Sequence, residues 1–394
     1  MKLLLQPKRL IKASLRLAFG LCCCVASQAS AVPEVLPDCP LNQARWLGSH
    51  NSFKPVLPPA YYERVATRVA ALIPAEQQAA ARQKLRSLEY GHASLTAQLN
   101  QGLRLLELDF LKDAQGGRYA APLFATEMQQ AMAAIGHLVA QYLPPSLAKP
   151  GFKVLHLPDI DFASHCADAR HCVGALRQWS EANPGHWPVL IVINIREQGA
   201  GAYLPATLAA KASQAEAWLA ADYQALEQLW LQGLGRNRLL IPDDVRQAPL
   251  SLAASLRQHG WPTLKQAAGR FVLLFDGSPA QLALYRAGYP SLQGRLMFGN
   301  YPADTDEAAI LVLNDPASQQ ADITSALAQG LLVRTRSDDG NVLHPARFTH
   351  ALKSGAQFIS SDFYSGAPQG EPAQQFRLPD RPFTEAFCHN RGTP

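Results

Sequence analysis

The feature of this chain that most restricts its fold is a series of short, uniformly apolar runs separated by longer stretches with helical character. Runs of this kind are buried on both faces, as parallel strands beneath helices are. They alternate with amphipathic segments such as 74–90 and 213–234, and no linker or internal repeat divides the series. The pattern predicts strands at 45–50, 103–110, 152–157, 188–195, 271–277, 309–315, 331–337 and 356–362, with 296–300 as a candidate ninth.

Strands and helices that alternate along about 360 residues predict an α/β fold, a single (β/α)8 TIM barrel with elaborated loops. An open, doubly wound sheet is the alternative. No GxGxxG or GxxxxGK[ST] motif follows the early strands, so the nucleotide-binding versions of that sheet lose support. We therefore expect one catalytic domain over 32–394.

Residues 1–31 have the features of a secretory signal peptide: five basic and no acidic residues, a short apolar run, and Ala29-Ser30-Ala31 as a cleavage site. The formal charge of the whole chain is +5, so the remainder is neutral without this segment. Neither charge nor any motif supports nucleic-acid binding, and the neutral charge argues against strong attraction to anionic membranes. We expect a monomer, secreted or periplasmic.

Four cysteines follow the predicted leader, and an even number in an exported protein favours disulfides over a zinc site. Of the three pairings that four cysteines allow, we favour Cys166 with Cys172, which closes a small loop. Cys39 and Cys388 would then join the two ends of the chain, as suits a barrel whose termini meet.

The first four predicted strands all end in polar or titratable residues, and in a parallel barrel these ends meet at one rim. Glu107 and Asp109 lie two apart on a strand, so both carboxylates point to the same face. With Asn51 and Asn194 on neighbouring strands, they form an oxygen-only donor set that suits Ca²⁺, with Mg²⁺ as the alternative. The competing interpretation is that arginines neutralise one or both acids, with Arg104 and Arg196 as the candidates.

Two histidines, His50 and His156, end the first and third strands beside this proposed metal site. A single histidine at such a position is usually structural, but two on one rim favour acid–base chemistry, for which a pKa near neutrality is suited. Four basic residues at the same rim are candidates for neutralising a phosphate: Lys54, Arg196, Arg334 and Arg336.

Taken together, these residues resemble the catalytic barrel of the phosphatidylinositol-specific phospholipases C, most closely the bacterial calcium-dependent branch. The motifs are GSHNS, LELD, VLH and the end of the fourth strand. Each motif is short, but their order and spacing are specific, and the similarity runs over roughly residues 40–365. Supporting stretches are 90–109, 154–166, 179–192, VRTRSD and SGAQFISSDF.

The resemblance implies roles for individual residues. His50 and His156 match the two catalytic histidines, and His92 matches a further recurring position. Asn194 stands where relatives usually carry a glutamate, so one negative charge is missing and weaker calcium affinity is expected, unless Glu197 compensates. The residues that match calcium ligands directly are Asn51, Glu107 and Asp109.

By the same resemblance, the inositol 2-hydroxyl attacks the phosphorus of a phosphatidylinositol-type lipid. Calcium lowers the pKa of this hydroxyl and offsets charge in the transition state. Glu107 or a histidine removes the proton, His156 protonates the departing diacylglycerol oxygen, and His50 donates a hydrogen bond to the phosphate. The enzyme would be a phosphoric diester hydrolase, or a lyase of the phospholipase C type.

Two other functions remain open from sequence. A glycerophosphodiester phosphodiesterase also uses two histidines, paired carboxylates and a metal, but normally has Arg after the first histidine and Asp after the third-strand histidine. Here Asn51 and Leu157 occupy those positions. The other is a catalytically silent barrel that binds a phospholipid or glycan.

A lipid substrate requires transient contact between the rim and a membrane surface. The apolar residues Phe53, Val56, Leu57, Tyr61 and Tyr62 either form a ridge for this contact or pack a rim helix against the barrel.

Overall fold

The structure, a computed structural model, describes residues 36–388, and the predicted signal peptide lies outside the described residues. The strands are β1 (Ala44–Gly48), β2 (Leu105–Asp113), β3 (Gly151–Val154), β4 (Val189–Ile195), β5 (Leu239–Leu240), β6 (Phe271–Asp276), β7 (Phe298–Gly299), β8 (Ile310–Val312), β9 (Leu332–Arg336), β10 (Phe358–Ser360) and β11 (Thr384–Ala386). The helices are α1 (Pro59–Ala70), α2 (Ala75–Arg86), α3 (Leu95–Gln101), α4 (Ala125–Ala133), α5 (Ala169–Ala182), α6 (Ala206–Ala209), α7 (Ala220–Leu234), α8 (Pro242–Val245), α9 (Leu252–His259), α10 (Pro279–Arg286), α11 (Gln320–Ala328) and α12 (Pro345–Ser354).

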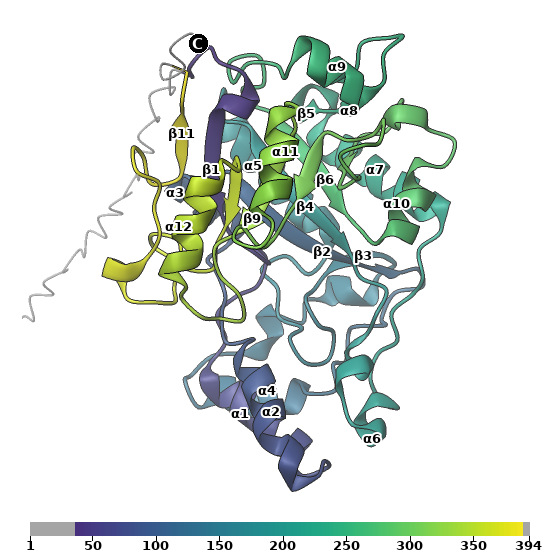
Figure 1. Ribbon diagram of the computed structural model, residues 1–394. Helices are drawn as coiled ribbons and strands as arrows, with labels where there is room; N and C mark the ends of the chain where they lie inside the picture. Colours follow the sequence, from purple (N-terminus) through teal and green to yellow (C-terminus); the bar gives the residue numbers. More distant parts are fainter. Residues whose placement is uncertain (1–35, 389–394) are drawn as a thin grey trace, which may run out of the picture. The chain divides into compact units, whose positions relative to one another are not determined.

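The strands form two sheets with helices around them (Figure 1). One sheet has the order β11-β1-β10-β9-β8, and the other has β3-β2-β4-β6-β5, with β7 also paired to β6. Every pairing is parallel except that of β11 with β1 and that of β3 with β2. The fold is therefore mixed α/β, and a closed eight-stranded barrel stays a prediction.

The two sheets approach each other closely where β1 meets β2. The backbone N–H of Ser49 donates to Leu105 O (3.1 Å), and that of Ser52 donates to Glu107 O (3.0 Å). A Cβ at Gly48 would lie 2.0 Å from Leu105 O, so only glycine fits there. This close approach places the end of β1 beside the carboxylates of β2.

All nine apolar runs form strands, but the direction of the third was predicted wrongly. β3 is antiparallel to β2, with Phe110 opposite Val154. A parallel neighbour needs a crossover that packs on the sheet. The helix of this connection, α4, instead packs against α1 beyond the strand ends. The candidate ninth run becomes β7, which joins β6 in parallel.

The predicted helical segments are only partly helical. The segment 74–90 contains α2, but 213–234 becomes helical only at α7. Acidic side chains bind the backbone of the part before α7: Asp159 accepts a hydrogen bond from Ser213 N (2.7 Å), and Glu197 accepts one from Trp218 N (2.6 Å). These long-range partners outweigh the local helical pattern.

The apolar rim residues pack inward rather than forming a ridge. Phe53, Leu57, Tyr61 and Tyr62 are all at most 4% exposed, and only Val56 is half exposed. Leu57, Tyr61 and Tyr62 pack in the helical group of α1, α2 and α4, which lies at the lower end of Figure 1, whereas Phe53 belongs to the main core around the strands. The packing interpretation is therefore the right one.

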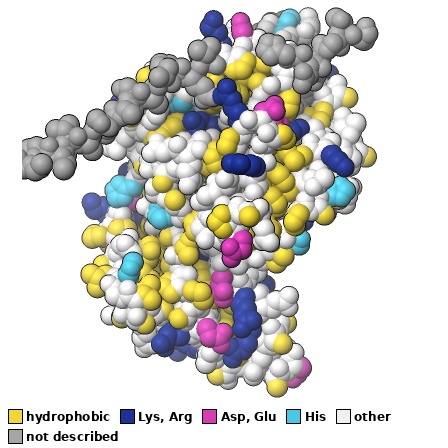
Figure 2. Space-filling view, turned by 90° about the vertical axis from the view of Figure 1, so that its left-hand side faces the viewer, with side chains coloured by type: hydrophobic (Ala, Val, Ile, Leu, Met, Phe, Trp, Pro, Cys, Tyr) yellow, Lys and Arg dark blue, Asp and Glu magenta, His cyan; other side chains and the backbone are white. Residues whose placement is uncertain are grey.

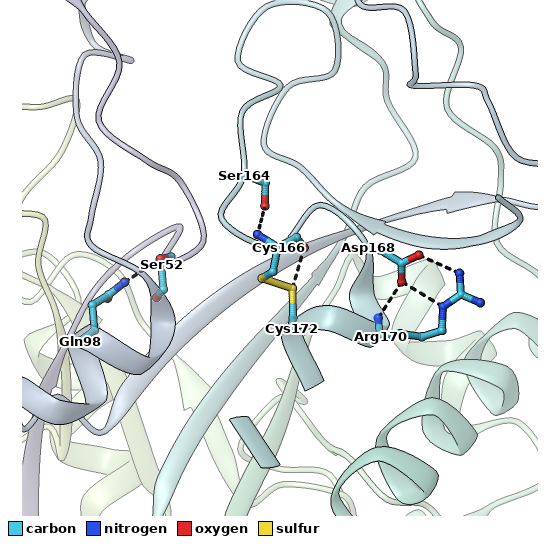
Figure 3. The surroundings of a disulfide bond; sticks show 7 residues. All are labelled: Ser52, Gln98, Ser164, Cys166, Asp168, Arg170 and Cys172. Carbon is cyan, nitrogen blue, oxygen red and sulfur yellow. Dashed lines mark hydrogen bonds and ion pairs between the residues drawn. A yellow bond between two sulfur atoms is a disulfide. The ribbon is translucent and has the colours of Figure 1, made fainter. Parts of the chain in front are cut away.

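Both expected disulfides are present. One disulfide joins Cys39, a few residues before β1, to Cys388, the last described residue, with the two Cα atoms 5.5 Å apart. Cys166 and Cys172 close a loop at the start of α5 (Figure 3). There Asp168 caps the helix by accepting a hydrogen bond from Arg170 N (2.9 Å).

A buried histidine gives the fold a predictable response to acid. His186 is 6% exposed, and burial lowers its pKa to about 4. Since an unfolded histidine titrates near 6.5, its contribution to stability is complete above pH 6.5 and is lost as the pH falls to about 4. The loss is at most about 3 kcal/mol.

We expect the free energy of unfolding of a His186→Asn variant, measured by urea denaturation, to fall less steeply between pH 6.5 and 4 than that of the parent. The difference between the two proteins at pH 7.5 gives the packing cost and is subtracted. Parallel stability curves for parent and variant would contradict the assignment.

Candidate active site

A polar cavity of about 270 Å³ opens at the carboxyl ends of the parallel strands. Its charged and titratable lining residues are His50, Glu107, Arg196, Asp276, Arg334 and Arg336, joined by Asn194 and Asn314. A larger cavity of about 830 Å³ lies at the other end, where β1, β9 and β10 begin, and holds none of the predicted site residues. The polar cavity is therefore the candidate site.

The carboxylates of β2 are neutralised within the protein. Asn194 Nδ2 donates to Glu107 Oε1 (2.7 Å) and to Asp109 Oδ1 (3.0 Å). Arg334 Nη2 donates to the other oxygen of Glu107. Arg196 grips Asp109 Oδ2 through Nη2 (2.6 Å) and Nε (2.9 Å). Each acid thus has one guanidinium partner, and all four carboxylate oxygens accept hydrogen bonds.

These ion pairs determine the charge of Glu107. Burial, the largest single cause, raises the pKa of Glu107, but the charges of Arg334, His50 and Arg336 and the hydrogen bond from Asn194 together outweigh burial, and the pKa is lowered. Glu107 is consequently ionised. The competing interpretation, in which arginines neutralise the acids, is correct for Arg196, which pairs with Asp109. Glu107 is also neutralised, but its partner is Arg334, which was predicted to face a phosphate.

The predicted calcium ligands suit a hard cation in chemical kind. They offer carboxylate and amide oxygens, and Asn51 Oδ1 is buried with no hydrogen-bond partner. The loop that carries Asn51 is held to β2, because Ser52 Oγ accepts from Glu107 N (2.8 Å). Within residues 36–388, however, no three His, Cys, Asp or Glu side chains converge as a metal cluster. A cation would therefore have to displace guanidinium groups from Glu107 and Asp109.

His50 is held between acids and a guanidinium. Its Nδ1 lies 3.4 Å from Asp362 Oδ2, and its Nε2 lies 3.8 Å from Glu107 Oε1. Arg336 approaches both ring nitrogens, at 3.4 and 3.5 Å. Burial, followed by the charge of Arg336, lowers the pKa of His50 and favours the neutral imidazole.

His92 supports His50 from behind rather than lining the cavity. Its Nε2 donates to the His50 carbonyl (2.7 Å) and lies 3.4 Å from Asp362 Oδ1. The side chain of His92 is buried. His92 therefore contacts both the backbone of His50 and the carboxylate beside it.

His156 belongs to a second buried group that does not line the cavity. Its Nδ1 lies 2.7 Å from Asp161 Oδ2, and the same oxygen accepts from Lys54 Nζ (3.0 Å). Lys54 also donates to Tyr62 OH (2.9 Å) and is fully buried, so the structure does not bring it to a phosphate.

One aromatic ring connects the two histidine groups. The ammonium of Lys54 lies 4.7 Å from the centre of the Tyr90 ring, and that ring stacks on His50 with 5.7 Å between centroids. The histidines thus belong to one contact network, although His156 lies outside the cavity lining.

We expect Asp161→Asn to weaken this network and destabilise the fold. Asp161 is fully buried, so its loss leaves the Lys54 ammonium without a counter-ion. Breaking a buried ion pair costs about 3–5 kcal/mol. The check is the midpoint of urea unfolding, and Lys54→Met combined with Asp161→Asn should recover part of the loss. A single variant as stable as the parent would refute the pairing.

Six predicted residues therefore share one cavity: His50, Glu107, Asn194, Arg196, Arg334 and Arg336. Glu197 is bound elsewhere, by Trp218 N and Gln281 Nε2 (2.7 Å), and does not compensate for Asn194. Sequence reasoning missed Asp276 and Asp362, which end β6 and follow β10. Both end apolar runs, FVLLFD and FISSD, so the strand-end rule could have found them.

Comparisons with known proteins give one family. The model of a family described as phosphoinositide phospholipase C, Ca²⁺-dependent, matches residues 39–381. No curated protein matches the sequence.

Solved structures of proteins from two bacteria match this chain, and the one from a Pseudomonas species has a similar fold. A calcium-dependent phosphoinositol-specific phospholipase C from a Pseudomonas species has a TM-score of 0.52 and 14% identity, covering 90% of this chain and 99% of that one. The apo form of that enzyme, in its first crystal form, has a TM-score of 0.50 and 15% identity, covering 88% of this chain and 95% of that one. A Ca²⁺-dependent enzyme from Streptomyces antibioticus has a TM-score of 0.48 and 16% identity, covering 82% and 94%.

Proposed function

Since the chain belongs to the family of Ca²⁺-dependent phosphoinositide phospholipases C, we propose that it cleaves the glycerol–phosphate bond of phosphatidylinositol-type lipids. The observation that carries this proposal is a cavity in which His50 faces a carboxylate and three arginines at the ends of parallel strands. An imidazole for proton transfer and guanidinium groups for a phosphate are the parts that phosphodiester cleavage requires.

The two sheets support the finer proposal of a barrel of the (β/α)8 type. Nine strands form parallel pairs: the two-residue strand β5, which pairs with β6, and the eight strands β1, β2, β4, β6, β7, β8, β9 and β10, whose order in the chain is that of a barrel. Asn300, after β7, accepts a hydrogen bond from Val312 N of β8 through Oδ1 (2.9 Å). With the β1–β2 bonds, this links the edges of both sheets.

In the proposed reaction His50 is the base that takes the proton of the inositol 2-hydroxyl. The sequence left this role to Glu107 or a histidine, but both oxygens of Glu107 are already bound. Asp362 and His92 hold the ring of His50 in place. Arg336, rather than His50, then donates to the phosphate. His156, oriented by Asp161, is the acid that protonates the departing diacylglycerol oxygen.

The proposed cofactor is Ca²⁺, with Mg²⁺ as the alternative, held by Asn51, Glu107, Asp109 and Asn194. When bound, the cation would supply Lewis-acid stabilisation of negative charge on the substrate. Arg334 and Arg196 keep the acids neutralised without it.

The chain is proposed to be exported and to act at a membrane surface as a monomer. Two disulfides are typical of an oxidising compartment. No described helix is long and apolar enough to cross a bilayer. Basic and acidic side chains lie next to one another at the lower end of Figure 2. Arg68 of α1 and Glu127 of α4 form a direct ion pair at 2.7 Å. The proposed contact with a membrane surface is transient.

The test follows cleavage of phosphatidylinositol in vesicles by ³¹P NMR, with calcium and with a chelator. We expect a cyclic inositol phosphate to form. Release of glycerol phosphate from glycerophosphodiesters in preference to lipid cleavage would favour a glycerophosphodiester phosphodiesterase. Lipid binding without turnover would favour a silent barrel. Either outcome would overturn the proposal.

A further inference from the structure

An apolar groove of about 490 Å³ lies directly beside the polar cavity. Its lining includes residues of α10, of the segment after β7 and of β8 (Figure 1 shows α10 beside β6). Its apolar side chains include Leu282, Ala283, Tyr301, Leu311 and Leu313.

The groove and the polar cavity share a wall. Gly277, which follows β6, lines both of them. Asp276 lines the cavity and Asn300 lines the groove, and Asn300 Nδ2 donates to Asp276 Oδ1 (2.8 Å). The two spaces are therefore neighbours, separated by Gly277 and by the hydrogen-bonded pair of Asp276 and Asn300.

The groove exists because one covering helix is missing. The connection from β7 to β8, residues 300–309, contains no helix, so α10 and β8 have no helix between them. Arg286 is the charged residue of the lining, and it is paired with Glu307 (3.1 Å). Its charge is therefore already compensated, and the groove suits an uncharged, apolar ligand.

We propose that this groove binds the first part of an acyl chain of the lipid whose phosphate and headgroup occupy the polar cavity. The inference rests on the proposed function and extends it to the tail of the substrate. A phospholipid has a polar headgroup and apolar acyl chains. The polar cavity suits the headgroup, and the neighbouring apolar groove suits a chain. Burying acyl methylenes here removes apolar surface from water and lowers KM for substrates with chains.

The experiment fills the groove with a bulky side chain. Ala283 is exposed and lines the groove, so Ala283→Trp blocks it without disturbing the core. Ala280→Trp is the matched control, because Ala280 is exposed on the same helix but does not line the groove. The substrates are monomeric diheptanoyl-phosphatidylinositol and glycerophosphoinositol, which has the same headgroup without chains.

We expect Ala283→Trp to lower kcat/KM about tenfold for the diheptanoyl lipid, equivalent to about two buried methylenes. Glycerophosphoinositol turnover and the Ala280→Trp control should not change. Equal loss on both substrates, or no loss on either, would overturn the proposal. So would a change of oligomeric state in sedimentation on Ala283→Trp alone, since a second copy would then cover the groove.

Direct binding separates this inference from the proposed reaction. A pyrene-labelled diacylglycerol should bind the unmodified protein and the control and bind Ala283→Trp about tenfold more weakly. If the unmodified protein cleaves neither substrate, the proposed function fails, while this measurement still tests the groove. Equal binding to all three proteins would refute the groove as an acyl site.

Discussion

His50→Ala is expected to lower kcat for phosphatidylinositol cleavage by about 10²–10⁴-fold, the usual loss when a general base is removed. His50 is the imidazole that lines the polar cavity, where Glu107 and Arg336 lie against its ring. The change should leave lipid binding largely intact, because Arg336, the proposed donor to the phosphate, remains. The measurement is steady-state turnover on mixed micelles, with calcium present.

Asp362→Asn is the companion to this variant. Asp362 touches His50 and not the cavity, so its loss disturbs the orientation of the imidazole. We expect kcat to fall less than in His50→Ala, with KM unchanged. Thermal unfolding of the variant is the control for folding. Full activity of His50→Ala would contradict the proposed mechanism outright.

Arg334→Met is expected to destabilise the protein by about 3–5 kcal/mol, the cost of leaving one partner of a buried ion pair alone. Arg334 is 2% exposed and Glu107 is 5% exposed, so neither charge can be solvated in place. The measurement is urea unfolding without calcium. Glu107→Gln combined with Arg334→Met should recover most of the loss, since neither member of this pair is then left as an unpaired buried charge.

Exposed arginines provide the matched control. Arg64 bonds Gln130 at the surface, and Arg64→Met should change stability by less than about 1 kcal/mol. If Arg334→Met is as stable as Arg64→Met, the prediction is wrong, and the ion pair between Arg334 and Glu107 does not stabilise the fold.

Calcium is expected to stabilise Arg334→Met, the variant that is destabilised without calcium. Arg334 neutralises Glu107, so its removal frees an acid for a divalent cation. We expect calcium to raise the unfolding temperature of Arg334→Met more than that of the parent, because a ligand stabilises the state that binds it. Equal shifts in both proteins would show that Arg334 and calcium do not compete.

Much of the architecture follows from local patterns. Burial on both faces leaves a uniform apolar run such as 189–195, and this signal needs no knowledge of neighbouring strands. The strand-end rule likewise placed His50, Asn194 and Arg334 at one edge, because parallel strands share their direction.

Direction and pairing required the folded chain. Nothing in the run 152–157 encodes whether β3 lies parallel to β2, since that depends on where α4 packs. In the same way, Lys54 and Arg334 carry charges that any phosphate could attract, yet Asp161 and Glu107 neutralise them. Composition and spacing specify which groups reach the strand ends. The pairing of charged groups depends on distances between residues that are remote in the chain. Those distances are set only when the sheets have assembled.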